Sequence, residues 1–372
     1  MKVKLGDIFE IGSGGTPSKS HPEYYGGNIP WVKTGDLKTT YLYNVEDFIT
    51  EEGLNNSSAK MYEPDTVLIA MYGATIGATS ILKINACTNQ ACAAFKPNNR
   101  VLPEYLYYFL QSKRDEFIKD GVGGAQPNIS AGYLKNVCME LPVLENQKEI
   151  VEVLNRVADV IKMRKQELIK LDNLIKARFV ELFGDMAHSG NKICLEEISD
   201  FVTVGIANSA THAYADSGIV MLRNQNIKEN HLDENDLIYI TPDFAQKYGS
   251  KQLAENDILV IRTGYPGVAC LVPKKYEGCQ TFTTLIVRLK DSTLAHANYV
   301  CHYINSSFGK NYVEQSKVGV AQQNFGAKAL AKMPIVIPSM ELQEQFAKFA
   351  EQTDKSKFAN MLITFETLKD CC

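Results

Sequence analysis

Residues 144–183 carry apolar and polar positions in the pattern of one long α-helix. The stretch contains no Gly and no Pro, and its apolar residues recur at steps of three and four. That 3.5-residue period is typical of a coiled coil, although the polar residues Lys165 and Asp172 interrupt the seam. Such a helix spans roughly 60 Å, and Gly184 is expected to end it. The alternative is an ordinary amphipathic helix packed on one domain, but a periodic helix this long more often connects or pairs. The repeating apolar positions are Val151, Leu154, Ala158, Ile161, Leu168, Ile175, Phe179 and Leu182.

A second helical pattern covers about residues 340–369, near the end of the chain. Ser339 is a suitable N-cap, and Phe346 and Phe349 begin an apolar face. The polar residues 353–357 interrupt that face. We expect the two long helices to be equivalent and to pair side by side in antiparallel orientation.

The regions before these helices, residues 1–143 and 187–338, share short matching segments in the same order. Matches that keep their order while their offset changes slowly indicate a duplicated unit, and the period is far too long for a solenoid. The offset begins at 190 residues and reaches 196. The matches are 5–8 with 195–198, 29–33 with 219–223, 65–68 with 257–260, 103–108 with 297–302, 124–128 with 320–324, and 134–142 with 330–338.

Each repeat consists mostly of short predicted strands. The runs 67–70 and 258–261 are rich in β-branched and aliphatic residues and lie beside glycine-containing turns. A helix is expected over residues 103–119, with Pro103 in its first turn. The sequence therefore predicts an α+β fold: two strand-rich domains separated by two long antiparallel helices in a coiled coil, with a pseudo-two-fold internal repeat.

The composition of the chain excludes few classes of protein. The chain has 372 residues, 45% of them hydrophobic and 22% charged, as expected for two or three globular domains. A net charge of -4 does not indicate nucleic-acid binding by itself, but local basic patches remain compatible with it. The nine cysteines form no Cys-x-x-Cys pair, and neither a signal peptide nor a run of about 18 apolar residues is found. We expect a cytoplasmic protein with free thiols and no membrane association.

No catalytic or metal-binding motif stands out. The glycine-rich residues 12–20 resemble a phosphate loop, but a glycine is missing before Lys19 and Pro17 removes an N–H donor. His296 and His302 are six residues apart, and we expect surface or capping roles for them rather than metal binding. An enzyme with an unrecognised site is a remaining alternative.

Several motifs together resemble the specificity (S) subunit of type I restriction-modification systems. The resemblance covers nearly the whole chain, and each motif would be weak alone. It implies a first target-recognition domain at 1–143, a first spacer helix at 144–186, a second target-recognition domain at 187–338 and a second spacer helix at 339–372. The residues that carry it are 14–18 (GGTPS), 27–37 (GNIPWVKTGDL), 73–77 (GATIG), 124–130 (GAQPNIS), 141–151 and 174–185.

The resemblance also implies a function. Each recognition domain would read one half of a bipartite target in double-stranded DNA, and the helix pair would set the spacing between the halves. Two methyltransferase (M) subunits and restriction (R) subunits would be the protein partners. S-adenosylmethionine, ATP and magnesium would belong to those partners, so this chain would be a recognition subunit without catalysis or cofactor. The second repeat lacks GGTPS and has Gln323 where the first has Pro127, so we expect an asymmetric target. A scaffold that holds two partner subunits without reading DNA is the alternative.

Candidate DNA contacts fall at matching positions of the two repeats. Lys33 and Arg223 follow matching strands, and Arg can bridge guanine O6 and N7, although a solvated strand-end residue is an equal alternative. Short polar side chains after them suit either base edges or turn capping. These are Thr34, Asp36, Asn224 and Asn226.

Two further groups complete the candidates. Glycine-rich turns let backbone N–H groups approach phosphate, but most such turns are only turns. The turn residues are Tyr72 and Thr75 in the first repeat and Arg262, Thr263 and Tyr265 in the second. Amide side chains could contact adenine in a bidentate manner or bond to their own loop, and we favour the loop. They are Gln126, Asn128, Gln322 and Asn324. Trp31 is expected in the core.

Overall fold

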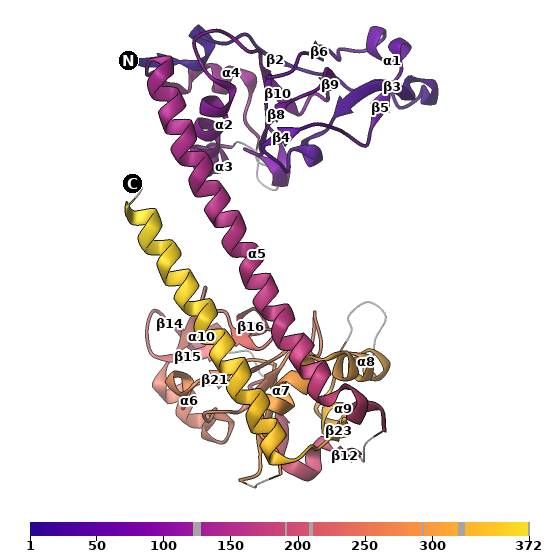
Figure 1. Ribbon diagram of the computed structural model, residues 1–372, viewed down its shortest axis with the longest axis vertical. Coiled ribbons are helices and arrows are strands. Elements are labelled where there is room, and N and C mark those ends of the chain that lie inside the picture. Colours follow the sequence, from indigo (N-terminus) through magenta and orange to yellow (C-terminus); the bar gives the residue numbers. More distant parts are fainter. Residues whose placement is uncertain (122–127, 190–191, 208–210, 292–293, 319–323, 371–372) are drawn as a thin grey trace. The chain divides into compact units, whose positions relative to one another are not determined.

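The computed structural model describes residues 1–372 except 122–127, 190–191, 208–210, 292–293, 319–323 and 371–372. Its contacts divide the chain into two compact units (Figure 1). Unit 1 consists mainly of Met1–Lys162 and unit 2 of Met163–Thr367. Each unit is described separately below.

Unit 1 is built on two mixed sheets and a short antiparallel pair. One sheet has the order β2 (Ile11–Ser13), β10 (Cys92–Phe95), β7 (Val67–Ala70), β8 (Thr79–Leu82) and β4 (Tyr41–Leu42). The other has the order β5 (Phe48–Ile49), β3 (Tyr25–Val32), β9 (Ala86–Thr88) and β6 (Met61–Tyr62). Strand β1 (Lys2–Lys4) pairs with β11 (Cys138–Glu140). The helices are α1 (Glu51–Asn55), α2 (Pro103–Ser112), α3 (Arg114–Asp120), α4 (Ala131–Asn136) and the start of α5 (Leu144–Ser189).

Unit 2 repeats this plan. One sheet has the order β13 (Ser199–Val204), β22 (Leu285–Leu289), β19 (Ile258–Val260) and β20 (Ala269–Leu271). The other has the order β14 (Tyr214–Ala215), β18 (Ile238–Ile240), β15 (Ile219–Leu222) and β21 (Gln280–Thr281). Strand β12 (Lys192–Cys194) pairs with β23 (Pro334–Val336), and β16 (Ile227–Lys228) with β17 (His231–Leu232). The helices are α6 (Pro242–Lys247), α7 (Ala297–Asn305), α8 (Ser307–Ser316), α9 (Ala327–Ala331) and α10 (Met340–Asp370), with the end of α5.

The continuous apolar runs form the central strand of each unit. All four residues of β7 are buried, because successive side chains of a strand point to opposite faces and both faces are covered here. Val67 and Ile69 pack into one core cluster, and Leu68 into another. Strand β19 divides its residues in the same way between two clusters. The predicted α+β class with a strand-rich centre is therefore confirmed.

Backbone hydrogen bonds correct one match between the repeats. The Asp65 N–H donates to the Leu82 carbonyl (2.7 Å), and the Asn256 N–H donates to the Val272 carbonyl (2.9 Å). Asp65 and Asn256 also share a left-handed backbone, with φ of 70° and 66°. Residues 65–68 therefore correspond to 256–259, and the predicted match with 257–260 is wrong by one residue. The sequence comparison matched identical aspartates, whereas the fold requires a residue that tolerates positive φ, and both Asp and Asn do.

The first residues of α5 are fastened to unit 1 by one buried glutamine. Gln147 is fully buried, and its Oε1 accepts a hydrogen bond from the Leu102 N–H (2.9 Å). Its Nε2 donates to the carbonyls of Arg100 (2.9 Å) and Pro142 (3.0 Å). One side chain thus supplies hydrogen-bond partners to three backbone groups in part-buried surroundings.

Gln343 does the same for α10 in unit 2. It is fully buried, its Oε1 accepts from the His296 N–H (2.8 Å), and its Nε2 donates to the carbonyls of Leu294 and Pro338 (both 3.0 Å). Gln147 and Gln343 are 196 residues apart, the same offset as the last sequence matches. The duplication therefore extends to individual side-chain hydrogen bonds.

Within unit 2 the second part of α5 packs beside α10, as Figure 1 shows. The rings of Phe179 and Phe346 lie 5.3 Å apart between centroids, and the Lys357 Nζ lies 2.5 Å from the Asp172 Oδ1. Contacts that move forward along α5 move backward along α10, so the helices are antiparallel. The predicted pairing is confirmed within this unit.

Two predicted helix ends are wrong. Helix α5 continues through Gly184 to Ser189, because the neighbouring Phe183 is buried in the core of unit 2 and glycine costs only about 1 kcal/mol inside a helix. The helix expected over 103–119 is two helices that break at Lys113. The Lys113 N–H bonds to the Leu110 carbonyl three residues back (3.2 Å), a tightened turn of the kind that ends an α-helix.

The two histidines of α7 have different roles. The Nδ1 of His296 accepts from the Asn298 N–H (3.2 Å) and caps the helix, as predicted. His302, for which a surface or capping role was predicted, is buried instead, with its ring 5.0 Å from that of Phe346. Burial and, to a smaller extent, the nearby Lys357 cation together lower the pKa of His302 to about 4.

We expect unit 2 to lose stability as the pH falls from about 6.5 to about 4. The pKa of His302 is about 4 in the folded state and near 6.5 when unfolded, so the unfolded chain binds more protons between these values. The loss should approach roughly 3 kcal/mol at pH 4 and be absent above pH 7. Urea unfolding of the chain and of His302→Gln across this range measures it. Equal pH slopes for both proteins would contradict the prediction.

Candidate nucleic-acid interface

The candidate residues of unit 2 lie where two loops meet. Thr263, in the turn after β19, forms an isolated antiparallel bridge with Asn324. The Phe325 N–H donates to the Arg262 carbonyl (2.9 Å). Residues 61 and 63 positions apart in the sequence are thereby held next to each other.

Side chains continue this contact. The Nε of Arg262 donates to the Oδ1 of Asn324 (3.0 Å), and the Nδ2 of Asn224 lies 3.3 Å from both the carbonyl and the Oγ1 of Thr263. We call Asn224, Arg262, Thr263 and Asn324 the polar cluster of unit 2. Tyr265 stands at the tip of the same turn with 82% of its surface exposed. The structure thus brings five candidate residues together.

Arg223 and Asn226 belong instead to the turn after β15. The Arg223 N–H donates to the Asn226 Oδ1 (3.0 Å), and the buried Asn226 amide donates to the carbonyls of Asp233 (3.0 Å) and Asn235 (2.9 Å). The Nη2 of Arg223 donates to the Asp236 carbonyl (2.5 Å). Of the two roles weighed for Asn226, this geometry corresponds to turn capping.

Unit 1 has the same turn after β3. The Lys33 N–H donates to the Asp36 Oδ2 (2.8 Å), and the Lys33 Nζ pairs with the Asp47 carboxylate (2.7 Å). Both side chains of that pair are about two-fifths exposed, so the pair contributes little stability. Trp31 is buried, and its Nε1 donates to the Gly15 carbonyl (3.1 Å), so its predicted core position is confirmed.

The loop junction of unit 1 is also present. Tyr72 forms an isolated bridge with Asn128, and the Ile129 N–H donates to the Met71 carbonyl (3.0 Å). Tyr72 is 43% exposed, and Thr75 donates through its Oγ1 to the Tyr72 carbonyl (3.2 Å). Thr34 is half-buried in the turn after β3. Gln126 and Gln322 lie outside the described residues.

Gly14 and Gly205 occupy equivalent positions in the two repeats, although the sequence comparison did not match them. A Cβ added to Gly14 would lie 1.8 Å from the Thr88 carbonyl oxygen, and a Cβ added to Gly205 would lie 2.4 Å from that of Thr281. Both positions therefore require glycine for the close approach of two backbones. Although unit 2 lacks GGTPS, it keeps the one glycine that this packing needs.

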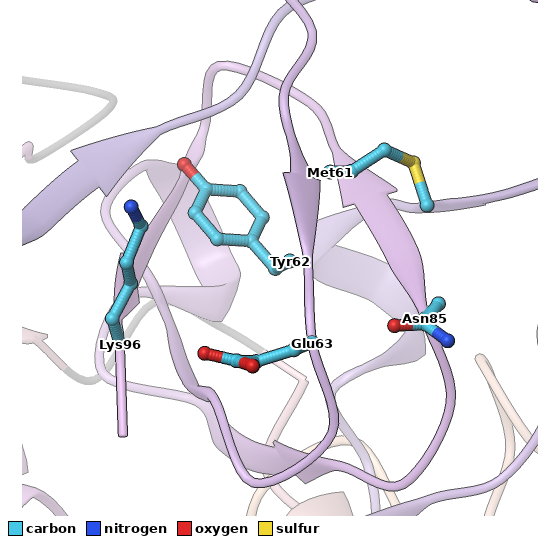
Figure 2. A pocket seen from close by; sticks show the side chains of 5 residues that line it. All are labelled: Met61, Tyr62, Glu63, Asn85 and Lys96. Carbon is cyan, nitrogen blue, oxygen red and sulfur yellow. The ribbon is translucent and has the colours of Figure 1, made fainter. Parts of the chain in front are cut away.

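A hollow of about 300 Å³ lies elsewhere in unit 1, where Figure 2 shows the Tyr62 hydroxyl and the Lys96 amine pointing to the same side. The Lys96 Nζ pairs with Glu10 (2.7 Å), and burial raises the pKa of Tyr62 to about 12, so the Tyr62 hydroxyl is not an activated acid or base. The lining residues are Met61, Tyr62, Glu63, Asn85 and Lys96.

The described part of the chain contains neither a metal-binding cluster nor a membrane-spanning helix. No group of three or more His, Cys, Asp or Glu side chains there could hold a metal ion. No helix in the same residues is both long and apolar enough to cross a membrane.

Comparisons with known proteins agree with one another. The family described as "Type I restriction modification DNA specificity domain" matches residues 1–173 and 185–362. The MjaIX specificity subunit of a type I restriction enzyme from Methanocaldococcus jannaschii is 34% identical over 187 residues, 49% of this chain and 43% of the relative. The EcoR124I/EcoR124II specificity subunit from Escherichia coli is 29% identical over 158 residues, 41% of this chain and 39% of the relative. The matched part therefore spans about two-fifths of the length of either relative.

One solved structure resembles the whole chain in fold. It was reported as the "structural basis underlying complex assembly and conformational transition of the type I R-M system". It is 16% identical, has a TM-score of 0.59, and covers 100% of this chain and 94% of its own. At this identity the likeness shows the fold alone.

Proposed function

The chain belongs to the family of type I restriction modification DNA specificity domains, and we propose that it recognises a specific DNA sequence. One observation carries the proposal most directly. Each unit presents an exposed loop junction with the same backbone bridge, Tyr72 with Asn128 and Thr263 with Asn324, but with different side chains around it. Two related domains that recognise different base sequences need the same backbone arrangement but different polar side chains.

The proposed target is bipartite and asymmetric. The turn of unit 1 carries Met71, Tyr72 and Ala74, whereas the corresponding turn of unit 2 carries Arg262, Thr263 and Tyr265. These side chains differ in charge, size and hydrogen-bonding capacity, so the two units would prefer different bases. In this proposal residues 1–143 and 187–338 are the target-recognition domains, and the long helices 144–186 and 339–372 set the spacing between the half-sites.

The proposed partners follow from the family. Two methyltransferase subunits and restriction subunits would supply the catalysis, with S-adenosylmethionine, ATP and magnesium held by them. The present chain would supply recognition without a cofactor of its own, in the cytoplasm. The rival is a scaffold that holds the same partners without reading DNA.

Footprinting of the purified chain on DNA selected from a random duplex library tests this proposal. We expect two protected patches separated by an insensitive gap, and an affinity that falls by at least ten-fold between 50 and 200 mM salt, since each phosphate contact releases counterions. Binding that ignores sequence, or no binding to DNA while protein partners are retained, would favour the scaffold.

A further inference from the structure

We propose that Arg262 reads a guanine in the half-site of unit 2 and that unit 1 has no equivalent reader. This inference rests on the proposed DNA-reading function and adds the identity of one base. It also moves the expected arginine contact from Arg223 to Arg262.

The backbone of Arg262 is fixed on both sides. Its carbonyl accepts from the Phe325 N–H (2.9 Å), and the Gly267 N–H donates to the carbonyl of the preceding Ile261 (2.9 Å). Asn324 is held as well, because it exchanges two backbone hydrogen bonds with Val318 (2.9 and 3.0 Å). Arg262 therefore projects from a rigid platform, as a base-reading side chain must.

The side chain is oriented at one end only. Its Nε–H donates to the Asn324 Oδ1 (3.0 Å), which fixes the plane of the guanidinium. Among the described residues, no other hydrogen bond or ion pair of this guanidinium is found. The two terminal nitrogens thus remain as a parallel pair of donors, and guanine presents the matching acceptors O6 and N7 in the major groove. Adenine has an amino group in place of O6, so it would set a donor against a donor.

Other arginines of unit 2 show what a structural role looks like here. Arg288 is neutralised by the buried Asp257 through two hydrogen bonds of 2.8 and 2.7 Å. Arg223 donates to the Asp236 carbonyl, and its Nε is buried. Arg262 differs from Arg288 because its hydrogen-bond partner is a neutral amide, and no acidic side chain of the described residues forms an ion pair with it at the half-exposed loop junction.

The repeat distinguishes base reading from phosphate binding. The residue of unit 1 at this position is Met71, whose carbonyl accepts the equivalent hydrogen bond from Ile129 (3.0 Å) and whose side chain is buried. The phosphate backbone is the same at both half-sites, so a phosphate anchor would be useful in both units. The two units keep the same backbone hydrogen bond but differ in the side chain at this position. A difference in the bases that they read explains this better than phosphate binding does.

Selection of bound sequences from a random duplex library, with the full chain, tests the inference. The wild-type chain should show a guanine preference of roughly 5- to 100-fold at one position of one half-site, the range for a bidentate contact. Arg262→Ala should abolish that preference and leave the other half-site unchanged. Arg262→Lys should keep most of the overall affinity but lose the guanine preference, because lysine keeps the positive charge but lacks the two parallel N–H donors of the guanidinium. Lys274→Ala removes an exposed charge of the same unit and should change neither.

Each outcome decides the matter. A uniform loss of affinity in Arg262→Ala, with the base preferences intact, would show that Arg262 contacts phosphate and would overturn the inference. Unchanged base preferences at the other positions of the unit 2 half-site show in the same experiment that unit 2 of the variant is folded. A wild-type chain with no base preference anywhere would overturn the proposed function itself, and the inference with it.

Discussion

Replacing Phe179 with Ala is expected to destabilise unit 2 by about 3–5 kcal/mol. Phe179 lies on α5 but is only 3% exposed, because it is part of the core of unit 2. Its ring centroid lies 5.0 Å from that of Phe183, 5.3 Å from Phe346 and 5.8 Å from Tyr299. The substitution removes the buried ring and the favourable contacts of an aromatic cluster, and it leaves a cavity that the three neighbouring rings cannot readily fill.

Val180→Ala is the matched control on the same helix. Val180 is 56% exposed, so its loss should change the free energy of unfolding by less than about 0.5 kcal/mol. Denaturant unfolding followed by hydrogen exchange in β19 reports on unit 2 in the full chain. Equal protection in the two variants would mean that the end of α5 is not a structural part of unit 2.

The sequence predicted the elements whose evidence is local. The period of α5 and the apolar runs of β7 and β19 can be read from neighbouring residues, because burial dictates which positions are apolar. The break at Lys113 and the passage of α5 through Gly184 could not, because both depend on how distant residues pack. The error of one residue at Asp65 has the same origin, since the determining property was a backbone angle rather than a residue type.

The sequence could predict which segments carry candidate DNA-binding residues. It could not predict which of these residues contact one another. The sequence favoured Arg223 as the arginine that could contact guanine and placed Arg262 in a glycine-containing turn that could approach phosphate. The structure separates them, because Arg223 is bound to Asp236, thirteen residues away, and Arg262 to Asn324, sixty-two residues away. Hydrogen-bond partners at such distances follow from the fold, so a single sequence offers no local sign of them.

Gln147→Ala is expected to destabilise unit 1, and Gln343→Ala unit 2, each by about 3–5 kcal/mol. Either change removes the side-chain partner of one N–H and two carbonyl groups, most of them in part-buried surroundings, and losing the partner of a buried polar group costs about 1–3 kcal/mol, partly relieved by water. Gln147→Glu should be no better, because a carboxylate cannot donate to the carbonyls of Arg100 and Pro142.

The two variants are each other's controls. Exchange protection in β7 should fall only in Gln147→Ala, and exchange protection in β19 should fall only in Gln343→Ala, since each glutamine bonds within its own unit. Gln352→Ala, at an exposed position of α10, should alter neither. If one of the two buried glutamines could be replaced without loss of stability in its unit, Gln147 and Gln343 would not contribute equally to the free energy of unfolding. The duplication would then have preserved the hydrogen-bond geometry of the buried glutamine in both units, but its contribution to stability in only one.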